Sequence, residues 1–488
     1  MRMRAIMLVL AWSIAAAALA RGPEVAGIRA YDLPGYTIVT LDPTAAQAAA
    51  RASVKADAIL GRLLGGANTA RNAPTILALF PNAIWARYLA PGRDITGQFV
   101  PHPFANYVEV GVGTEAIEAD VMHEYAHCYL HSQTSGLVPL WFDEGVAQFV
   151  ANTTLTGEIV TLGKMPRWLT YVPNLAEPWT KVATSWMPMV TLLGLDGYSR
   201  IYRDTERNSS VHKQAWVLVQ RGFATDPDDF GRKMSALLDA QKDLVPAETA
   251  IRNSFGMSPA NFDLLVRSFL KAEFATRELE IGPLPFPGLP AGRELPALES
   301  LDLLAGMMMA SEYHLDRFDE VIEAMDRAAP GSPVTRAWRM RLAARRGGGA
   351  LAQLVHGLRA GSDPRLLRGA GLALFERALA AQADARPDQA LVLLGLATSA
   401  HPDDAEAVWA YATLAAGLKR DLPLARIRIE AVRATWPANA DLAMAATQVY
   451  EALGETQLAR EALQATRRLA KRPEIIRWAK QKLAAEGP

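Results

Sequence analysis

Apolar positions in residues 36–275 follow two alternating patterns. Short runs rich in β-branched and aromatic residues predict strands, and they lie at 36–41, 75–80, 97–100, 107–112 and 158–162. Stretches with apolar residues three or four positions apart predict helices, and these lie at 45–64, 114–131, 142–152, 187–195, 211–223, 228–242, 247–255 and 259–272. Strands and helices in this order, followed by helices alone, predict an α+β domain.

A segment rich in proline and glycine follows this region. Five prolines and three glycines occur within residues 281–296. They exclude a helix and predict an extended, semi-rigid linker. We therefore expect a domain boundary at 281–297, with one domain at 36–275 and a second at 298–488.

The second domain reads as helical throughout, with a repeat. Prolines that follow one helix and introduce the next recur at spacings of 34, 38, 35 and 36 residues, at Pro330, Pro364, Pro402, Pro437 and Pro473. A period near 34 with two helices per unit resembles tetratricopeptide repeats (TPR). The resemblance implies an all-α array with a concave groove that binds a protein partner. The alternative is an array that only stabilises the first domain.

The charge balance bears on the class of partner, and the amino-terminal sequence bears on the cellular location. Basic and acidic residues balance at 51 each, which argues against a nucleic-acid partner. Residues 1–20 combine a basic start, an apolar run and the small-residue site Ala18-Leu19-Ala20, the pattern of a signal peptide. We expect export, in a bacterium to the periplasm. If the leader is not cleaved, it anchors the chain in the inner membrane, which would be its only membrane contact.

Two histidines one helical turn apart, in His123-Glu124-Tyr125-Ala126-His127, carry the clearest chemistry. Positions i and i+4 lie on one face of a helix, so both imidazoles can point at one metal ion. Zinc prefers nitrogen and oxygen ligands, and a catalytic zinc has three protein ligands and an open position for water. The segment predicts a zinc site whose third ligand comes from elsewhere. The alternative is a helix with two ordinary histidines.

Two glutamates supply the remaining groups. Glu144 opens the helix after the loop 132–140, and Gly145 beside it permits close packing of two helices. We expect Glu144 to be the third ligand. Glu124 is turned about 100° from His123 around the helix, so it should overhang the metal-bound water. Zinc lowers the pKa of such a water to about 7, and Glu124 then serves as the general base.

The pairing of H-E-x-x-H with the downstream P-x-W-x-x-E-G-x-A, at 139–147, resembles the gluzincin metallopeptidases, and the bacterial peptidase MA-like domain in particular. The resemblance covers about residues 36–271. It implies an α+β zincin-like peptidase domain, with a mixed sheet, an active-site helix and a helical subdomain, in which His123, His127 and Glu144 bind Zn²⁺. It also implies that the strand beside the zinc helix is a sheet edge that pairs with substrate. Our candidate is 107–112, and an ordinary buried strand is the alternative.

The chain also departs from the family pattern. Related domains often carry a tyrosine where this chain has His212, and a protonated His212 would stabilise the transition-state oxyanion. A surface histidine is the alternative. The aminopeptidase sequence G-x-M-E-N is absent, which favours an endopeptidase. Histidine ligands need an orienting partner, and Asp143 and Gln148 are both candidates.

Two functions remain after these arguments. The first is an exported zinc endopeptidase that hydrolyses peptide or protein substrates, with repeats that recruit substrate or a partner. The second is a non-catalytic envelope adaptor or assembly protein that uses a degenerate peptidase domain and the TPR scaffold. In an envelope chaperone or assembly factor, zinc would be only a structural clip, but such sites usually have four protein ligands and only three are apparent. The presence of Glu124 and of all three candidate ligands favours the enzyme.

Overall fold

The structure is a computed structural model. It describes residues 22–65, 72–93, 95–113, 116–166, 186–197, 199, 205–286, 288–311, 315–347 and 349–485. The expected leader at 1–20 lies outside these residues. Among the helices within them, none is both long and apolar enough to cross a membrane.

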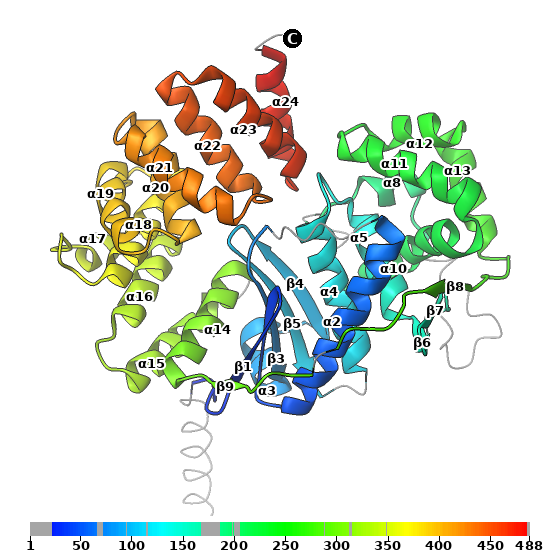
Figure 1. The fold of residues 1–488 in the computed structure, drawn as a ribbon, viewed down its shortest axis with the longest axis horizontal. Coiled ribbons are helices and arrows are strands. Elements are labelled where there is room, and N and C mark those ends of the chain that lie inside the picture. Colours follow the sequence, from blue (N-terminus) through cyan, green and yellow to red (C-terminus); the bar gives the residue numbers. More distant parts are fainter. Residues whose placement is uncertain are drawn as a thin grey trace, which may run out of the picture.

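A six-stranded mixed sheet forms the centre of the N-terminal part, with the strand order β4-β5-β3-β2-β1-β9 (Figure 1). Its strands are β1 (Arg29–Leu33), β2 (Tyr36–Thr40), β3 (Thr75–Pro81), β4 (Gly97–His102), β5 (Ala105–Val112) and β9 (Arg293–Glu294). The strands β2, β3 and β5 are parallel. β4 is antiparallel to β5, and β1 is antiparallel to β2. The prediction of a mixed sheet is confirmed.

The sheet differs from the sequence-based expectations at its borders. The expectation that 107–112 forms the edge is wrong, because β5 lies between β3 and β4, and the outer strand is β4. The chain turns back at Pro103 and Phe104, so β4 pairs with β5 along its whole length. β1 lies before residue 36, where we expected the domain to begin. β9 lies inside the expected linker and pairs with β1.

Helices cover both faces of the sheet. On one face, α2 (Pro43–Leu64) and α4 (Ile117–Gln133) share a core with Val108 and Val110 of β5. On the other face, Tyr107 belongs to a core with α14 (Ala297–Ser311) and α15 (Phe318–Ala328). The π-helical turn η1 (Trp85–Leu89) adds Trp85 and Tyr88 to this second core. This double coverage explains why β5 alternates between the two cores.

A helical subdomain packs against α4 through α5. It is formed by α5 (Leu140–Ala151), α8 (Met189–Gly194), α10 (Thr205–Gln220), α11 (Arg232–Lys242), α12 (Ala247–Phe255) and α13 (Pro259–Phe269), with a small sheet of β6 (Thr154–Thr156), β7 (Ile159–Leu162) and β8 (Arg277–Glu280). The π-helical turns η2 (Arg221–Thr225) and η3 (Pro227–Gly231) connect α10 to α11. The predicted helices of this region are present, with ends shifted by a few residues.

The C-terminal part is all-helical, as predicted. Beyond α14 and α15, its helices are α16 (Pro333–Arg345), α17 (Leu351–Leu354), α18 (Pro364–Leu379), α19 (Pro387–Ala400), α20 (Ala405–Leu418), α21 (Leu422–Thr435), α22 (Ala440–Leu453), α23 (Thr456–Leu469) and α24 (Pro473–Ala485). Successive helices form hairpins that stack in an arc, here called the helical array (Figure 1). The unit that follows Gly347 contains the very short α17.

The helical array contacts the N-terminal part at both of its ends. At its start, Glu320 of α15 accepts hydrogen bonds from Arg87 and Tyr88, at 2.8 and 2.9 Å. At its end, Lys471 donates to the carbonyl oxygens of Leu130 and Thr134, at the C-terminal end of α4. The array therefore extends over one side of the sheet and of α4.

Candidate metal centre

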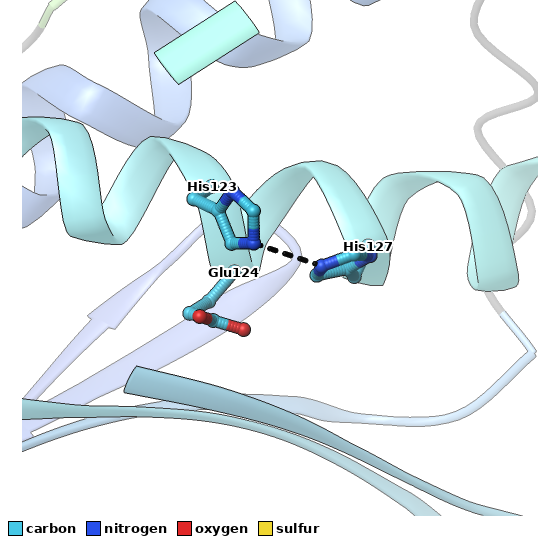
Figure 2. A group of neighbouring side chains, drawn as sticks. All are labelled: His123, Glu124 and His127. Atoms are coloured by element: carbon cyan, nitrogen blue, oxygen red, sulfur yellow. Dashed lines mark hydrogen bonds between the residues drawn. The ribbon is translucent and has the colours of Figure 1, made fainter. Parts of the chain in front are cut away.

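His123 and His127 lie on one face of α4, as their spacing predicts. Their Nε2 atoms are 3.2 Å apart, and both rings lean toward the same point (Figure 2). α4 has Glu118 and Asp120 in its first turn and His131 in its last, an arrangement that suits the helix dipole. The local sequence thus forms the helix and places both imidazoles.

Glu144 reaches the same point from α5. Its Oε2 lies 3.7 Å from Nε2 of His123 and 3.8 Å from Nε2 of His127. Glu144 is only 2% exposed. The long-range packing of α5 against α4 therefore brings the expected third ligand to the histidines.

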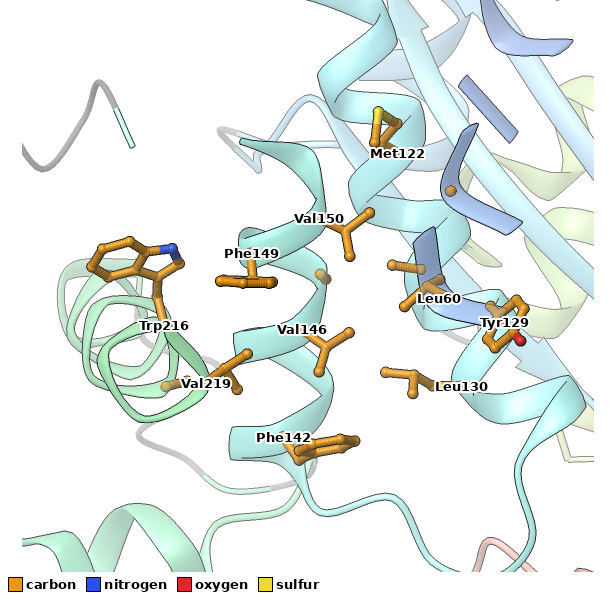
Figure 3. Close-up of a cluster of buried hydrophobic side chains, with 14 of the residues drawn as sticks. Leu60, Met122, Tyr129, Leu130, Phe142, Val146, Phe149, Val150, Trp216 and Val219 are labelled. Carbon is orange, nitrogen blue, oxygen red and sulfur yellow. The ribbon is translucent and has the colours of Figure 1, made fainter. Parts of the chain in front are cut away.

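Gly145 explains how α5 fits between its neighbours. A Cβ atom at this position would lie 2.5 Å from Val219 Cγ2 and 2.6 Å from the carbonyl oxygen of Ala215, both on α10. Only glycine permits this approach. Figure 3 shows the result, with Phe149 of α5 facing Trp216 and Val219 of α10 and Val146 and Val150 facing α4. The packing fixes the rotation of α5 and hence the direction of Glu144.

The three atoms fit a zinc ion. Tetrahedral zinc with bonds of 2.0–2.1 Å separates its ligand atoms by about 3.3 Å. The observed separations of 3.2, 3.7 and 3.8 Å are close to this value. Two imidazole nitrogens and a buried carboxylate oxygen are also the donor types that zinc prefers. His123, His127 and Glu144 are therefore the residues that would hold the ion.

Asp143 orients the second histidine. Its Oδ1 lies 2.7 Å from Nδ1 of His127, and its Oδ2 lies 2.8 Å from Nε2 of His131. The contact leaves Nε2 of His127 directed at the metal position. Of the two candidate partners, Asp143 takes this role, whereas Gln148 is seen only accepting a hydrogen bond from Asn152 through its main-chain oxygen.

His131 was not predicted. The signal for it is present, because 123, 127 and 131 continue the same i, i+4 series along one helix face.

Burial and charge shift the titration of the histidines in opposite directions. Burial, followed by the neighbouring His127, lowers the pKa of His123 to about 3. Burial also acts to lower the pKa of His127, but the carboxylates of Asp143 and Glu144 outweigh it and raise this pKa to about 10. Burial favours the neutral acid for both carboxyls, yet the adjacent histidines hold the pKa values of Asp143 and Glu144 well below their usual range. Negative charge thus accumulates where a cation would bind.

Glu124 leaves α4 on the side that faces the sheet (Figure 2). A carboxylate oxygen of Glu124 and nitrogens of His123 and His127 lie within 4.8 Å of one another. Its Cγ packs against Gly97 of β4, where a Cβ would lie only 2.8 Å away. Burial raises the pKa of Glu124 to about 8. The side chain is beside the metal position but on a different side of the helix from the two imidazoles.

His212 also belongs to the cluster. It lies on α10, and its Nε2 is 2.8 Å from Oε2 of Glu144. The side chain is 21% exposed, so it is not an ordinary surface histidine. Nitrogens of His123 and His212 and an oxygen of Glu144 lie within 4.8 Å of one another. His212 therefore has two geometrically acceptable roles, as a group that faces substrate or as a further metal ligand.

The cluster opens into a large cleft of about 2310 Å³. One wall is β4 with the preceding loop, and another is the helical subdomain around Leu193 and Val245. The helical array contributes Asn439, Lys471 and Arg472. This volume exceeds that of a typical small-molecule pocket, which is about 300–1,000 Å³. Comparison of the chain with protein-family profiles, curated proteins and solved structures finds no match.

Proposed function

We propose that this protein is a zinc-dependent endopeptidase with a gluzincin-type centre in a zincin-like α+β domain. The observation that supports it most is the convergence of His123, His127 and Glu144 from two helices, at separations that suit tetrahedral zinc. A general base, an orienting carboxylate and a long cleft adjoin the same point. These are the parts required for hydrolysis of a peptide bond by an activated water.

Each residue of the site has a separate role in this proposed reaction. Bound zinc supplies Lewis acidity and lowers the pKa of a water to about 7. Glu124 takes the proton of the attacking water and returns it to the leaving amine. Asp143 holds the His127 ring through Nδ1. His212 donates toward the carbonyl oxygen as negative charge develops on it.

We place the substrate along β4. β4 is the outer strand of the sheet, and it lines the cleft from Gly97 to His102. An exposed strand edge binds an extended chain through main-chain hydrogen bonds, which gives affinity with little sequence preference. This proposal replaces β5, which is paired on both sides. The leader supports work outside the cytoplasm, in the periplasm or at the inner membrane.

One pair of measurements tests the proposal. We expect the purified protein to bind about one zinc ion per chain and to cleave an unstructured protein at internal bonds. Glu124→Gln should keep the zinc and lose cleavage by a factor of at least about 10³. Equal zinc binding with no cleavage by the wild type would contradict the proposal.

A second function has its own supporting observation. The 2.8 Å contact between His212 and Glu144 is compatible with a fourth protein ligand. Four protein ligands make a closed, structural zinc site, as in a non-catalytic adaptor. His212→Ala distinguishes the two. Zinc affinity should stay within about threefold of wild type if His212 faces substrate, and should fall 100-fold or more if it binds the metal.

A further inference from the structure

The turn between β4 and β5, residues 102–105, is seated in the helical array, and we call it the hairpin tip. Phe104 packs against the core of the array. Its ring lies 5.3 Å from that of Trp409 on α20, which in turn contacts Phe375 of α18 at 5.0 Å. Phe104 therefore contacts the face of the array that is formed by α18 and α20, the first helices of two successive hairpins. We expected a partner protein to bind the groove of the array, but here a segment of the same chain occupies part of its surface.

Asn439 forms hydrogen bonds that hold the hairpin tip in place. Its Oδ1 accepts a hydrogen bond from the main-chain nitrogen of Leu442 and thereby caps α22. Its Nδ2 donates to the carbonyl oxygen of Pro103 at 2.5 Å and to that of Asn72 at 3.0 Å. One side chain thus ends a helix of the array and holds the hairpin tip.

An ion-pair network joins successive hairpins of the array near the hairpin tip. Arg341 of α16 and Arg368 of α18 both pair with Glu406 of α20, at 3.1 and 2.7 Å. Side chains from three successive hairpins therefore share one ion-pair network. Beside it, His102 is held in contact with Phe104, with ring centroids 6.0 Å apart. Such a network resists sliding of one hairpin past the next.

The other end of β4 contacts the metal centre. The ring of Phe99 stacks on His127 at 6.5 Å and lies 5.4 Å from His131. Gly97 packs against Glu124. β4 has antiparallel partners along its whole length, from Gly97 with Val110 to His102 with Ala105. The paired strand thus connects the hairpin tip to Phe99 and Gly97.

We propose that Phe104 is a positioning residue for the proposed hydrolysis, on which this inference rests. By seating the hairpin tip on Trp409, it fixes β4 in the register and tilt that substrate pairing and His127 require. The helical array acts on the metal centre within the same chain, through this strand.

The test uses the full-length protein loaded with zinc. Phe104→Ala should lower kcat/KM for an unstructured substrate about tenfold, mainly through KM, with zinc content unchanged. Trp409→Ala should have a similar effect, and the double variant should be no worse than either single one, because both remove one contact. Amide hydrogen exchange of β4 should accelerate in the same variants. Phe104→Tyr should restore most of the activity.

Two further variants keep the test decisive. Asn439→Asp retains the cap of α22 and removes the donor to Pro103, so it should weaken substrate binding without unfolding the array. Leu379→Ala, on an exposed position of α18, is the control and should match the wild type. Wild-type kcat/KM and wild-type exchange of β4 in Phe104→Ala and Asn439→Asp would overturn the inference. Absence of cleavage by the wild type would instead refute the proposed function, and the exchange data would still report the coupling.

Discussion

At the scale of single residues, the centre depends on which side chain directs each imidazole. The carboxylate of Asp143 contacts Nδ1 of His127 and also contacts His131. A ligand histidine that is oriented in this way binds metal more tightly, because its ring is fixed and its basicity is raised.

Asp143→Asn should weaken zinc binding by about 10- to 100-fold. The amide keeps the shape of the side chain but loses the charge that faces His127 and His131. Competition with a chromophoric chelator measures the affinity. Gln148→Ala is the control and should bind zinc like the wild type. Equal losses in both variants would refute the assignment of Asp143.

Glu109 is a buried carboxyl away from the metal centre. It lies on β5 at 0% exposure and accepts a hydrogen bond from Gln98 at 2.7 Å. Burial raises the pKa of Glu109 from 4.5 to about 7, although the hydrogen bond from Gln98 opposes the shift. Between these values the folded state binds more protons than the unfolded state. The free energy of unfolding therefore falls as the pH rises through this window.

Glu109→Gln should remove this loss, which amounts to about 3 kcal/mol above pH 7 at 1.36 kcal/mol per pKa unit. Glutamine can still accept from Gln98. Urea unfolding at pH 5 and pH 8 should show a decline for the wild type that the variant lacks. The same change at the exposed Glu118 is the control. A variant that loses as much stability as the wild type over this range would show that Glu109 is not the cause.

At the scale of elements, the position of α5 decides whether a third ligand exists. α5 packs between α4 and α10 (Figure 3). The absence of a side chain at Gly145 sets its distance from α10. The sequence indicates Glu144 as a candidate, but the packing of this helix directs the carboxylate.

Gly145→Ala should destabilise the protein by about 1–3 kcal/mol, because the added methyl overlaps Ala215 and Val219. It should also weaken zinc binding, since α5 must move away from α10. Thermal unfolding and metal titration measure the two effects. Gly417→Ala is the control, because a Cβ there meets nothing within 4 Å, and alanine should be neutral or stabilising in a helix. Wild-type zinc affinity in Gly145→Ala would contradict the coupling.

At the scale of the whole molecule, the metal centre joins parts that are distant in the chain. A zinc ion would link α4, which packs on one face of the sheet, to α5 of the helical subdomain. The C-terminal end of the helical array also contacts α4, because Lys471 donates to the carbonyl oxygen of Leu130 near the end of this helix. Three parts of the molecule thus meet near the candidate metal centre.

Zinc removal should therefore lower the thermal stability of the folded chain. A ligand that binds only the native state stabilises it by about 2.7 kcal/mol at a free concentration of 100 Kd. Calorimetry before and after dialysis against a chelator should show a lower Tm, and added zinc should reverse it. His127→Ala should show no response to zinc, whereas Glu124→Gln should respond like the wild type. An unchanged Tm in the wild type would exclude a bound ion that links these parts.

The sequence by itself determined the local features of this protein. Apolar spacing and turn residues indicated β2, β3, β4, β5 and β7, the helices of the N-terminal part and the all-helical C-terminal part, because these depend on neighbours within a few positions. The same signals did not indicate β1, β6, β8 or β9. The i, i+4 spacing also fixed the direction of His123 and His127, since helix geometry alone sets it.

Only the tertiary structure decided the rest. It chose Asp143 over Gln148, made β4 the edge in place of β5, and placed His212 in the cluster. It also filled the face of the array with Phe104. Each of these depends on the packing of segments tens to hundreds of residues apart, and no periodicity within one segment encodes which other segment it will meet.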